Sequence, residues 1–285
     1  MALVYLRITD NCNLECAHCC YECGPRKKTM HAKKLETILD NLEGPEVTTL
    51  LLGGGEPFTR WTRLEQALSS IQERKLRGKY PELRKIAVQS NGLWATDIPT
   101  AKEYIQKLAS LGANNLTITG GDNFHDEQSK VRSLIRPHRA LAYVYDAWRL
   151  LCRESAGTFV LFAGDLSVYP RYAAPFGRAK NLSPDHMKIR TNCARPIENI
   201  TIDPQGNAYH CCWQQPFTLG SLAKLPIVEI LRRDESFSSG ESWIITAAKA
   251  LGRYDSADAE AYRSNPCSVC EKTFKDVSID WNEAR

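Results

Sequence analysis

The sequence predicts an α/β fold built around a parallel sheet, and three observations support this prediction. In the first 155 residues, short apolar runs of strand length alternate with longer amphipathic stretches. Every distinctive polar or glycine-rich motif of this part directly follows an apolar run. From about Leu182 onward the alternation stops, which indicates a second, smaller domain. We therefore expect one domain over residues 1–181 and another over residues 182–285.

The elements of the first domain are expected in a regular order. Strands are predicted where apolar runs are short and bounded by turn residues, at 4–9, 47–52, 85–89, 115–119 and 158–163. Helices are predicted where apolar residues recur at a helical spacing, at 32–42, 63–74, 100–111 and 138–153. Residues 164–176 are too few for a further complete helix and strand. The sequence thus predicts an abbreviated domain with five clear strands.

Composition and charge exclude several classes of function. A hydrophobic content of 43% and a charged content of 25% are typical of a globular protein. The net charge of +4 is too small and too dispersed to indicate a nucleic acid partner. The short basic run Arg26-Lys27-Lys28 is more typical of a solvated loop than of a phosphate site. No apolar stretch has membrane-spanning length and the first residues are typical of a strand, so we expect a cytoplasmic protein without a membrane partner.

The eleven cysteines gather in two groups. Disulfides seldom persist in the cytoplasm, so these thiols need another explanation. Five of them lie between Cys12 and Cys23, five lie between Cys193 and Cys270, and Cys152 stands apart. Two separate groups of thiols indicate two metal sites.

The first group contains the spacing C-x3-C-x2-C at Cys12, Cys16 and Cys19. Three thiolates this close can bind one soft metal centre, and they leave a four-iron cluster with one iron that lacks a protein ligand. An exchangeable position of this kind is what a reactive metal centre needs, whereas a structural site is usually fully ligated. A disulfide or a zinc cluster is the structural alternative.

The second group consists of separated cysteines that a hairpin can bring together. Alternating apolar residues flank the turn sequence Asp-Pro-Gln-Gly-Asn between residues 200 and 211, which predicts a β-hairpin. This hairpin would place Cys193 near Cys211, and the later pair Cys267 and Cys270 can complete four-thiolate ligation. Zinc accepts the same spacing, so a four-cysteine zinc site is the alternative here.

Four polar motifs follow predicted strands or the end of the first domain. They are Gly53-Gly54-Gly55-Glu56-Pro57, Ser90-Asn91-Gly92, Asp122-Asn123-Phe124-His125-Asp126 and Gly177-Arg178-Ala179. In β/α barrels and open α/β sheets, the carboxyl ends of the strands build the active site. We therefore expect these motifs to face one pocket. Simpler roles remain open for some residues, namely an Asn-Gly turn at Asn91, a helix cap at Asp122 or Asp126, and a surface ion pair at Arg178.

The C-x3-C-x2-C motif and the strand-end motifs together resemble the radical S-adenosylmethionine (radical SAM) superfamily. The resemblance implies an incomplete, TIM-like (β/α) barrel of five to six strands, S-adenosylmethionine bound to the open iron, and its reductive cleavage to a 5′-deoxyadenosyl radical. The positions that match the family's cofactor contacts are His18, Gly54, Gly55, Glu56, Ser90, Asn91, Asp122 and His125. The chain departs from the family pattern in having Gly120 where a serine is frequent. Arg178 matches an element that often closes the barrel, and it is implied to bind the cofactor carboxylate or a substrate oxygen.

The second domain resembles the twitch domain, the shorter relative of the SPASM domain. This implies a small α+β domain with one auxiliary [4Fe–4S] cluster on Cys193, Cys211, Cys267 and Cys270, and thus two [4Fe–4S] clusters in all. The resemblance implies an oxidoreductase that abstracts a substrate hydrogen atom and oxidises the substrate through the auxiliary cluster. A flavodoxin- or ferredoxin-type protein would supply electrons.

The substrate expected from this resemblance is a small aminocyclitol- or aminosugar-type alcohol of natural-product biosynthesis. A maturase that cross-links or epimerises a ribosomally made peptide is the alternative. Such maturases often carry an amino-terminal peptide-binding domain, which is not expected here because the first strand begins within the first few residues. Alternatives from another class are an iron–sulfur electron carrier and a zinc-binding module.

Overall fold

The computed structural model describes residues 2–119, 123–154, 199–209, 217–238, 248–249, 251–255, 272 and 279–280. Several predicted features lie outside these residues: the strand at 158–163, the domain boundary near residue 182, and the side chains of Asp122, Arg178, Cys193, Cys211, Cys267 and Cys270. No helix in the described part of the chain is long and apolar enough to cross a membrane.

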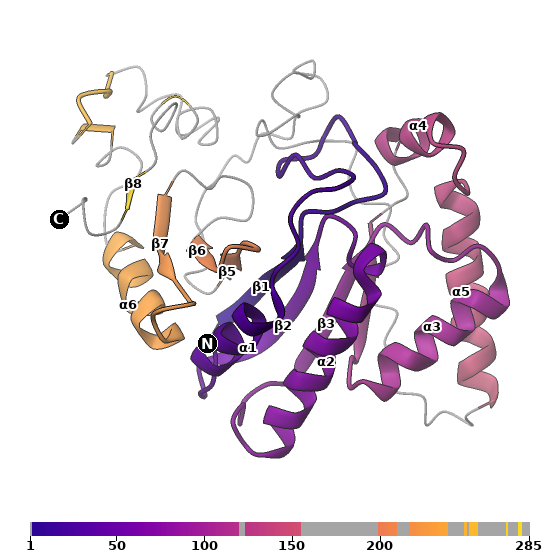
Figure 1. Cartoon of the computed structure of the whole chain (residues 1–285), viewed down its shortest axis with the longest axis horizontal. Coiled ribbons are helices and arrows are strands. Elements are labelled where there is room, and N and C mark those ends of the chain that lie inside the picture. Colours follow the sequence, from indigo (N-terminus) through magenta and orange to yellow (C-terminus); the bar gives the residue numbers. More distant parts are fainter. Residues whose placement is uncertain are drawn as a thin grey trace.

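The described strands form one open sheet in the order β4-β3-β2-β1-β5-β6-β7-β8 (Figure 1). Its first part is parallel, as predicted, and consists of β1 (Ala2–Thr9), β2 (Val47–Gly54), β3 (Lys85–Ser90) and β4 (Asn115–Ile118). Each strand begins and ends within two residues of its predicted bounds. Because all four run in the same direction, the loops that follow them lie at one edge of the sheet.

Strand β1 is central and is buried on both faces. Val4, Leu6 and Ile8 are fully buried on one face, as expected for a parallel strand under a helical layer. Arg7 and Thr9 are also buried but belong to the opposite face, because successive side chains alternate across a strand. The end of this face contacts the loop that carries the first three cysteines, because Arg7 pairs with Asp10.

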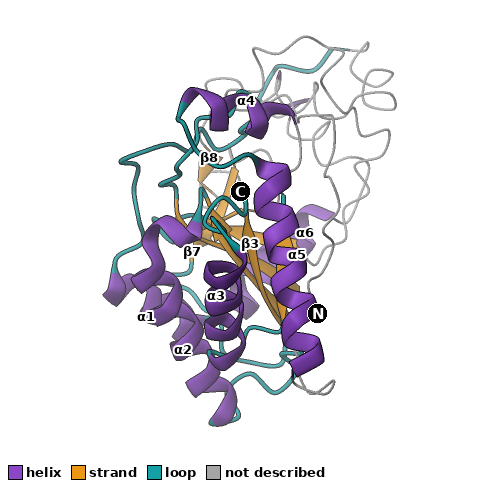
Figure 2. Cartoon of the chain, turned by 90° about the vertical axis from the view of Figure 1, so that its right-hand side faces the viewer, coloured by secondary structure: helices purple, strands orange, loops and turns teal. Residues whose placement is uncertain are grey.

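Helices cover one side of the parallel part. They are α1 (Ala32–Asn41), α2 (Trp61–Leu76), α3 (Ile98–Ser110) and α5 (Pro137–Glu154), while the short η1 (Pro57–Arg60) and α4 (Asn123–Val131) follow the ends of β2 and β4. Figure 2 shows α1, α2, α3 and α5 side by side in front of the strands. Asp126 lies within the first turn of α4 and pairs with Arg136 and, at 3.4 Å, with Lys130, so the predicted capping role of Asp126 is wrong.

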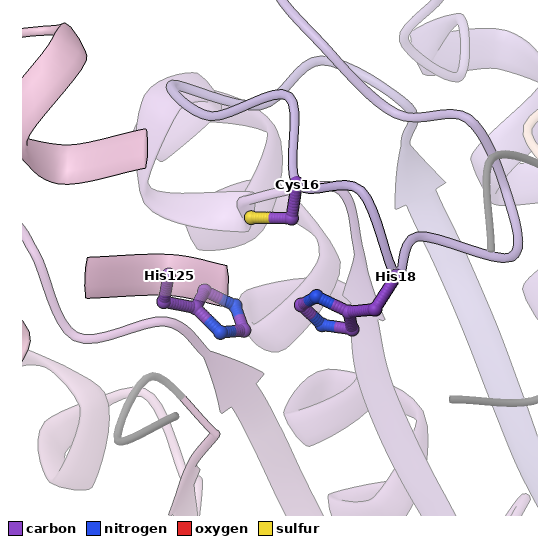
Figure 3. A group of neighbouring side chains, drawn as sticks. All are labelled: Cys16, His18 and His125. Atoms are coloured by element: carbon purple, nitrogen blue, oxygen red, sulfur yellow. The ribbon is translucent and has the colours of Figure 1, made fainter. Parts of the chain in front are cut away.

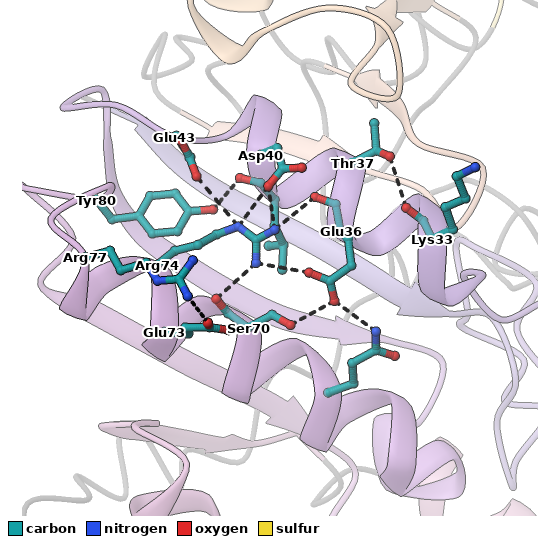
Figure 4. Close-up of polar contacts among 12 residues, drawn as sticks. Lys33, Glu36, Thr37, Asp40, Glu43, Ser70, Glu73, Arg74, Arg77 and Tyr80 are labelled. Carbon is teal, nitrogen blue, oxygen red and sulfur yellow. Dashed lines mark hydrogen bonds and ion pairs between the residues drawn. The ribbon is translucent and has the colours of Figure 1, made fainter.

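Helices α1 and α2 are joined by a network of charges centred on Arg74 (Figure 4). The guanidinium pairs with Glu36 at 3.0 Å and with Asp40 at 2.5 Å, and it lies 3.8 Å from Glu43. The Ser70 hydroxyl of α2 donates to the Glu36 carboxylate of α1 at 2.8 Å. These contacts hold the two helices together at the rim of the core.

The later part of the chain contributes β5 (Asn199–Ile202), β6 (Asn207–Tyr209), β7 (Phe217–Ser221), α6 (Ile227–Ser238) and β8 (Ile279–Asp280). The predicted hairpin is confirmed, because β5 and β6 are antiparallel neighbours. In its turn the Asp203 carboxylate accepts hydrogen bonds from the backbone N–H groups of Gln205 and Asn207 at 2.8 and 2.9 Å.

This hairpin continues the sheet of the first domain. Strand β5 is parallel to β1, with Leu3 opposite Asn199 and Leu6 opposite Ile202. The Lys34 amine of α1 also donates to the Gln205 carbonyl at 2.9 Å. Residues of the two predicted domains therefore share one sheet.

Candidate functional site

The site is built on the segment of residues 10–30, here called the cysteine loop, which follows β1. Its two ends are tied together, because the Asp10 N–H donates to the Lys28 carbonyl at 2.7 Å and the Met30 N–H donates to the Ile8 carbonyl at 2.8 Å. Within the loop, Cys12 and Cys16 are buried and Cys19 is half-buried. These hydrogen bonds fix the two ends of the loop that carries the three cysteines.

Arg7 joins the start of the cysteine loop to its middle. Its guanidinium pairs with Asp10 at the start of the loop and lies 3.7 Å from the ring centroid of Tyr21 in the middle of the loop. Burial raises the pKa of the Asp10 carboxyl, and the neighbouring Arg7 opposes that shift. Sequence reasoning did not single out Arg7, because an arginine within a strand has no distinctive spacing.

The glycines after β2 allow a close approach to the cysteine loop. Gly54 has φ +130°, and a Cβ atom built on it would lie 2.0 Å from the Thr9 carbonyl oxygen. A Cβ atom on Gly55 would lie 2.4 Å from the Asn11 carbonyl oxygen. The Gly55 and Glu56 N–H groups donate to these same carbonyls at 2.7 and 2.8 Å. The glycines thus dock the end of β2 against the start of the loop.

Glu56 is the centre of a buried hydrogen-bond network. Its carboxylate, 1% exposed, accepts from the Asn91 N–H at 2.7 Å, from the Phe58 N–H at 3.0 Å and from the Ser90 hydroxyl at 3.0 Å. Burial raises the pKa of Glu56 to about 7, although the hydrogen bonds from Asn91, Phe58 and Ser90 oppose the shift. The carboxylate therefore ties the end of β2 to the end of β3.

Asn91 extends this network to the first cysteine. Its side-chain N–H donates to the side-chain oxygen Oδ1 of Asn13 at 2.8 Å and lies 4.0 Å from the Cys12 sulfur. The side-chain oxygen Oδ1 of Asn91 accepts from the Leu93 N–H at 3.0 Å, so the turn expected at this position is present as well. The path Glu56–Asn91–Cys12 joins two strand ends to the cysteine loop.

Ser90 is fully engaged with protein partners. Its hydroxyl donates to Glu56 and accepts from the Gly92 N–H at 3.0 Å and the Trp94 indole N–H at 2.9 Å. The Trp94 ring stacks on Phe58 with 4.3 Å between centroids. Trp94 was not predicted as part of the site, because only the folded chain places its indole against Ser90.

The motif that follows β4 meets the loop at a group of three side chains. The ligand atoms of Cys16, His18 and His125 all lie within 4.8 Å of one another, and Figure 3 shows the three side chains pointing toward a common space. The His18 ring lies 4.8 Å from the His125 ring and 4.9 Å from the Phe124 ring, between centroids. The prediction that loops after different strands face one site is thus confirmed for these residues.

The cysteine loop fits a thiolate-ligated cluster. The Leu14 N–H points at the Cys12 sulfur at 3.4 Å, and the Cys23 N–H points at the Cys19 sulfur at 3.3 Å. Hydrogen bonds to ligand sulfurs are typical of iron–sulfur sites and help to set their potential. The buried positions of Cys12 and Cys16 also suit a centre that must be shielded from water.

Two family models match this chain. The model of the radical SAM superfamily matches residues 6–164, and the SPASM model, described as an iron–sulfur cluster-binding domain, matches residues 193–272. Together they cover the cysteine loop, the motifs that follow β2, β3 and β4, and all four cysteines of the second predicted cluster, but not Gly177-Arg178-Ala179. A search of the curated proteins finds no relative by sequence.

Solved structures share the fold over nearly the whole chain. One is native anSMEcpe with bound AdoMet, at 12% identity and a TM-score of 0.53, where the match covers 99% of this chain and 94% of the other. Another is native anSMEcpe with bound AdoMet and the Cp18Cys peptide, at 13% identity and a TM-score of 0.50, covering 99% and 93%. At such identities the likeness establishes the fold alone.

Proposed function

Because the chain belongs to the radical SAM superfamily and carries a SPASM-type iron–sulfur domain, we propose that it is a radical SAM oxidoreductase. Its cofactors are S-adenosylmethionine and [4Fe–4S] clusters. The observation that carries the proposal is the convergence of the ends of β2, β3 and β4 on the cysteine loop, through Glu56, Asn91 and His125. This convergence would build a cofactor pocket, which an iron–sulfur electron carrier or a zinc-binding module does not need.

The residues have distinct roles in this proposal. Cys12, Cys16 and Cys19 would hold the first cluster, and Cys193, Cys211, Cys267 and Cys270 would hold the auxiliary cluster. When bound, the first cluster and S-adenosylmethionine supply the electron and the 5′-deoxyadenosyl radical. The protein positions these groups and excludes water from them.

The strand-end residues orient the cofactor pocket. Glu56 holds the Asn91 backbone, and Asn91 holds Asn13 of the cysteine loop, so the loop is fixed relative to the sheet. The rings of His18 and Phe124 and the backbone at Gly54 and Gly55 would border the bound S-adenosylmethionine. Asp122 would accept hydrogen bonds from ribose or substrate, and Arg178 would bind a carboxylate or substrate oxygen.

The proposed reaction is the two-electron oxidation of a substrate C–H bond, with the auxiliary cluster as electron acceptor. A small aminocyclitol- or aminosugar-type alcohol is the proposed substrate. A peptide is the second candidate, because anSMEcpe, which shares the fold over 99% of this chain, has a solved structure with bound peptide. A flavodoxin- or ferredoxin-type protein is the proposed reductant.

Anaerobic reconstitution followed by incubation with S-adenosylmethionine and dithionite tests the proposal. We expect about eight iron atoms per chain and the formation of 5′-deoxyadenosine, detected by mass spectrometry. Cys16→Ala should abolish this cleavage, whereas Cys152→Ala, a matched change on α5, should preserve it. If the reconstituted wild-type protein forms no 5′-deoxyadenosine, the proposed function is wrong.

The auxiliary cluster and the substrate are tested separately. Cys267→Ala should spare cleavage of S-adenosylmethionine but prevent net oxidation of the substrate. Mixtures of aminocyclitols and of peptides should be incubated with the wild-type enzyme and examined for a mass loss of two hydrogens. Oxidation confined to peptides would reject the aminocyclitol proposal and favour the maturase.

A further inference from the structure

We propose that the exposed basic segment Arg26-Lys27-Lys28, together with Arg60, is the docking surface for an acidic one-electron carrier protein. This inference rests on the proposed function, because it concerns how an electron reaches the cluster held by the cysteine loop. One electron would leave the reduced flavin or iron–sulfur centre of the carrier, which is thereby oxidised by one electron. The cluster gains that electron, and the reductive cleavage of S-adenosylmethionine consumes it.

The charge of this surface is unbalanced. Arg26, Lys27, Lys28 and Arg60 are all exposed, and the described part of the chain holds no ion pair of theirs. The cysteine loop contains two exposed carboxylates, and one of them, on Glu15, is already paired with Arg132. Glu22 is the other. An excess of positive charge therefore remains at the surface of the loop.

Arg26 and Arg60 meet at the residue that precedes the first cluster ligand. The Arg26 N–H donates to the Asn11 side-chain oxygen at 2.8 Å, and the Arg60 guanidinium reaches the same oxygen at 3.5 Å. Asn11 is bonded directly to Cys12, and the Cys12 N–H in turn donates to the Gly24 carbonyl at 3.0 Å. Between a partner that contacts Arg26 or Arg60 and the first cysteine of the C-x3-C-x2-C motif there would therefore be a single residue, Asn11.

The basic segment is an exposed loop, as its sequence suggests, and its backbone is held in a defined shape. Arg26 has φ +61°, a left-handed conformation that residues other than glycine adopt only where surrounding contacts impose it. The Asn11 side chain supplies that contact. At the other end, the Lys28 carbonyl accepts from the Asp10 N–H at 2.7 Å and the Thr9 hydroxyl at 3.2 Å. The lysine side chains are therefore presented from a fixed backbone.

Charge complementarity selects the occupant of this surface. Opposite charges across an interface mainly accelerate association and orient the partner. An acidic carrier protein gains this steering and brings the electron that the adjacent site requires. A nucleic acid or an anionic membrane would meet the same charges but would supply no electron.

The test compares electron donors in the variant Lys27→Glu/Lys28→Glu, which leaves the backbone contacts of Lys28 in place. The rate of 5′-deoxyadenosine formation is measured anaerobically with limiting reduced flavodoxin and, separately, with dithionite. We expect the KM for flavodoxin to rise about tenfold and its dependence on ionic strength to flatten. The maximal rate with dithionite should stay within about twofold of the wild type, because a small reductant needs no docking surface.

The matched control is Lys85→Glu/Lys224→Glu, which reverses two exposed lysines that belong to other segments of the chain. Lys85 begins β3, about 17 Å of strand from the motif that follows it. This variant should behave as the wild type with both donors. A neutral variant, Lys27→Gln/Lys28→Gln, should show an intermediate KM.

Three outcomes would overturn the proposal. The first is an unchanged KM for flavodoxin in Lys27→Glu/Lys28→Glu, or an equal rise in the control variant. The second is a parallel loss with dithionite, which would show that the lysines maintain the loop itself. The third is a wild-type enzyme that dithionite activates and flavodoxin does not. Failure of the wild type with dithionite would instead contradict the proposed function.

Discussion

The Arg74 network and the Glu56 network organise charge in opposite ways. Arg74 lies at the rim between α1 and α2, and it is surrounded by carboxylates, of which Asp40 is 61% exposed. Glu56 is buried, and its hydrogen-bond donors are a serine hydroxyl and two backbone N–H groups, all of them neutral. One network therefore balances charge at the surface, whereas the other buries a carboxylate among neutral donors.

This difference separates structural charge from functional charge. Ion pairs at the rim of the core stay close to water, so their charges lose little hydration free energy while they hold the helices together. A buried carboxylate costs free energy, as the raised pKa of Glu56 indicates, and natural sequences concentrate such costs at functional sites. Glu56 lies where the ends of β2 and β3 meet the cysteine loop. The comparison predicts that Glu56 variants lose activity, whereas Arg74 variants lose only stability.

The largest expected effect is that of Glu56→Ala on the cleavage of S-adenosylmethionine. Without the carboxylate, the Ser90 hydroxyl and the Asn91 N–H lose their acceptor, and Asn91 no longer holds the cysteine loop in register. We expect the rate of 5′-deoxyadenosine formation to fall roughly 100-fold. Glu36→Ala, which removes a carboxylate of the Arg74 network, should change this rate less than about twofold. Equal losses in the two variants would contradict the comparison.

The pH dependence of stability should reveal the proton held by the buried Glu56 carboxyl, with the neutral variant Glu56→Gln as the reference. The pKa of Glu56 is about 7 in the folded protein and about 4.5 when unfolded, so the folded state holds the proton more tightly. The free energy of unfolding of the wild type should therefore fall as pH rises from about 4.5 to about 7. This fall should amount to about 3 kcal/mol, since one pKa unit corresponds to about 1.4 kcal/mol. The unfolding free energy of Glu56→Gln should lack this contribution.

Urea denaturation of the reduced protein at several pH values measures this effect. The difference in unfolding free energy between the wild type and Glu56→Gln isolates Glu56, because all other titrating groups are common to both. A difference that does not change between pH 4.5 and pH 7 would show that the pKa of Glu56 is not raised.

A smaller effect is expected for Arg74→Met. The change removes the partner of Glu36 and Asp40 while it preserves much of the aliphatic stem, so we expect a loss of about 1–2 kcal/mol in unfolding free energy. The rate of 5′-deoxyadenosine formation at 25 °C should remain within about twofold of the wild type. A tenfold loss of activity without a loss of stability would break the comparison.

The smallest effect is expected for Arg77→Met, the matched change three residues further along the chain. Arg77 pairs with Glu73, and their side chains are 69% and 59% exposed. Exposed pairs of this kind contribute little, so the loss should stay below about 0.5 kcal/mol. Thermal unfolding of Arg74→Met and Arg77→Met under the same conditions measures the contrast. Equal shifts in Tm would show that burial of the guanidinium does not matter.

Much of the fold could be predicted from local patterns. Short apolar runs located β1 to β4 within two residues, because a strand buried under helices needs a continuous run of apolar side chains. The turn around Asp203 located the hairpin of β5 and β6. The pairing of β5 with β1 could not be predicted, because nothing in either strand specifies a partner so distant in the sequence.

The sequence predicted which motifs belong to the candidate site, but not most of the contacts between their residues. The motifs at Glu56, Asn91 and His125 were recognised because glycine-rich and polar residues follow strands. The contacts of Arg7 with Asp10 and Tyr21, and that of Trp94 with Ser90, were missed. Arg7 and Trp94 belong to no recognisable sequence motif, so their roles become visible only when the folded chain brings their partners close.

The sequence by itself determined the chemistry available to this protein, since the spacing of Cys12, Cys16 and Cys19 and the glycines at Gly54 and Gly55 are covalent facts of the chain. Only the tertiary structure decided that the Glu56 carboxylate binds the end of β3 and that Asn91 reaches Cys12. The physical reason is that hydrogen bonds between distant residues depend on the packing of whole strands and helices. Local patterns specify each element, and packing specifies which elements meet.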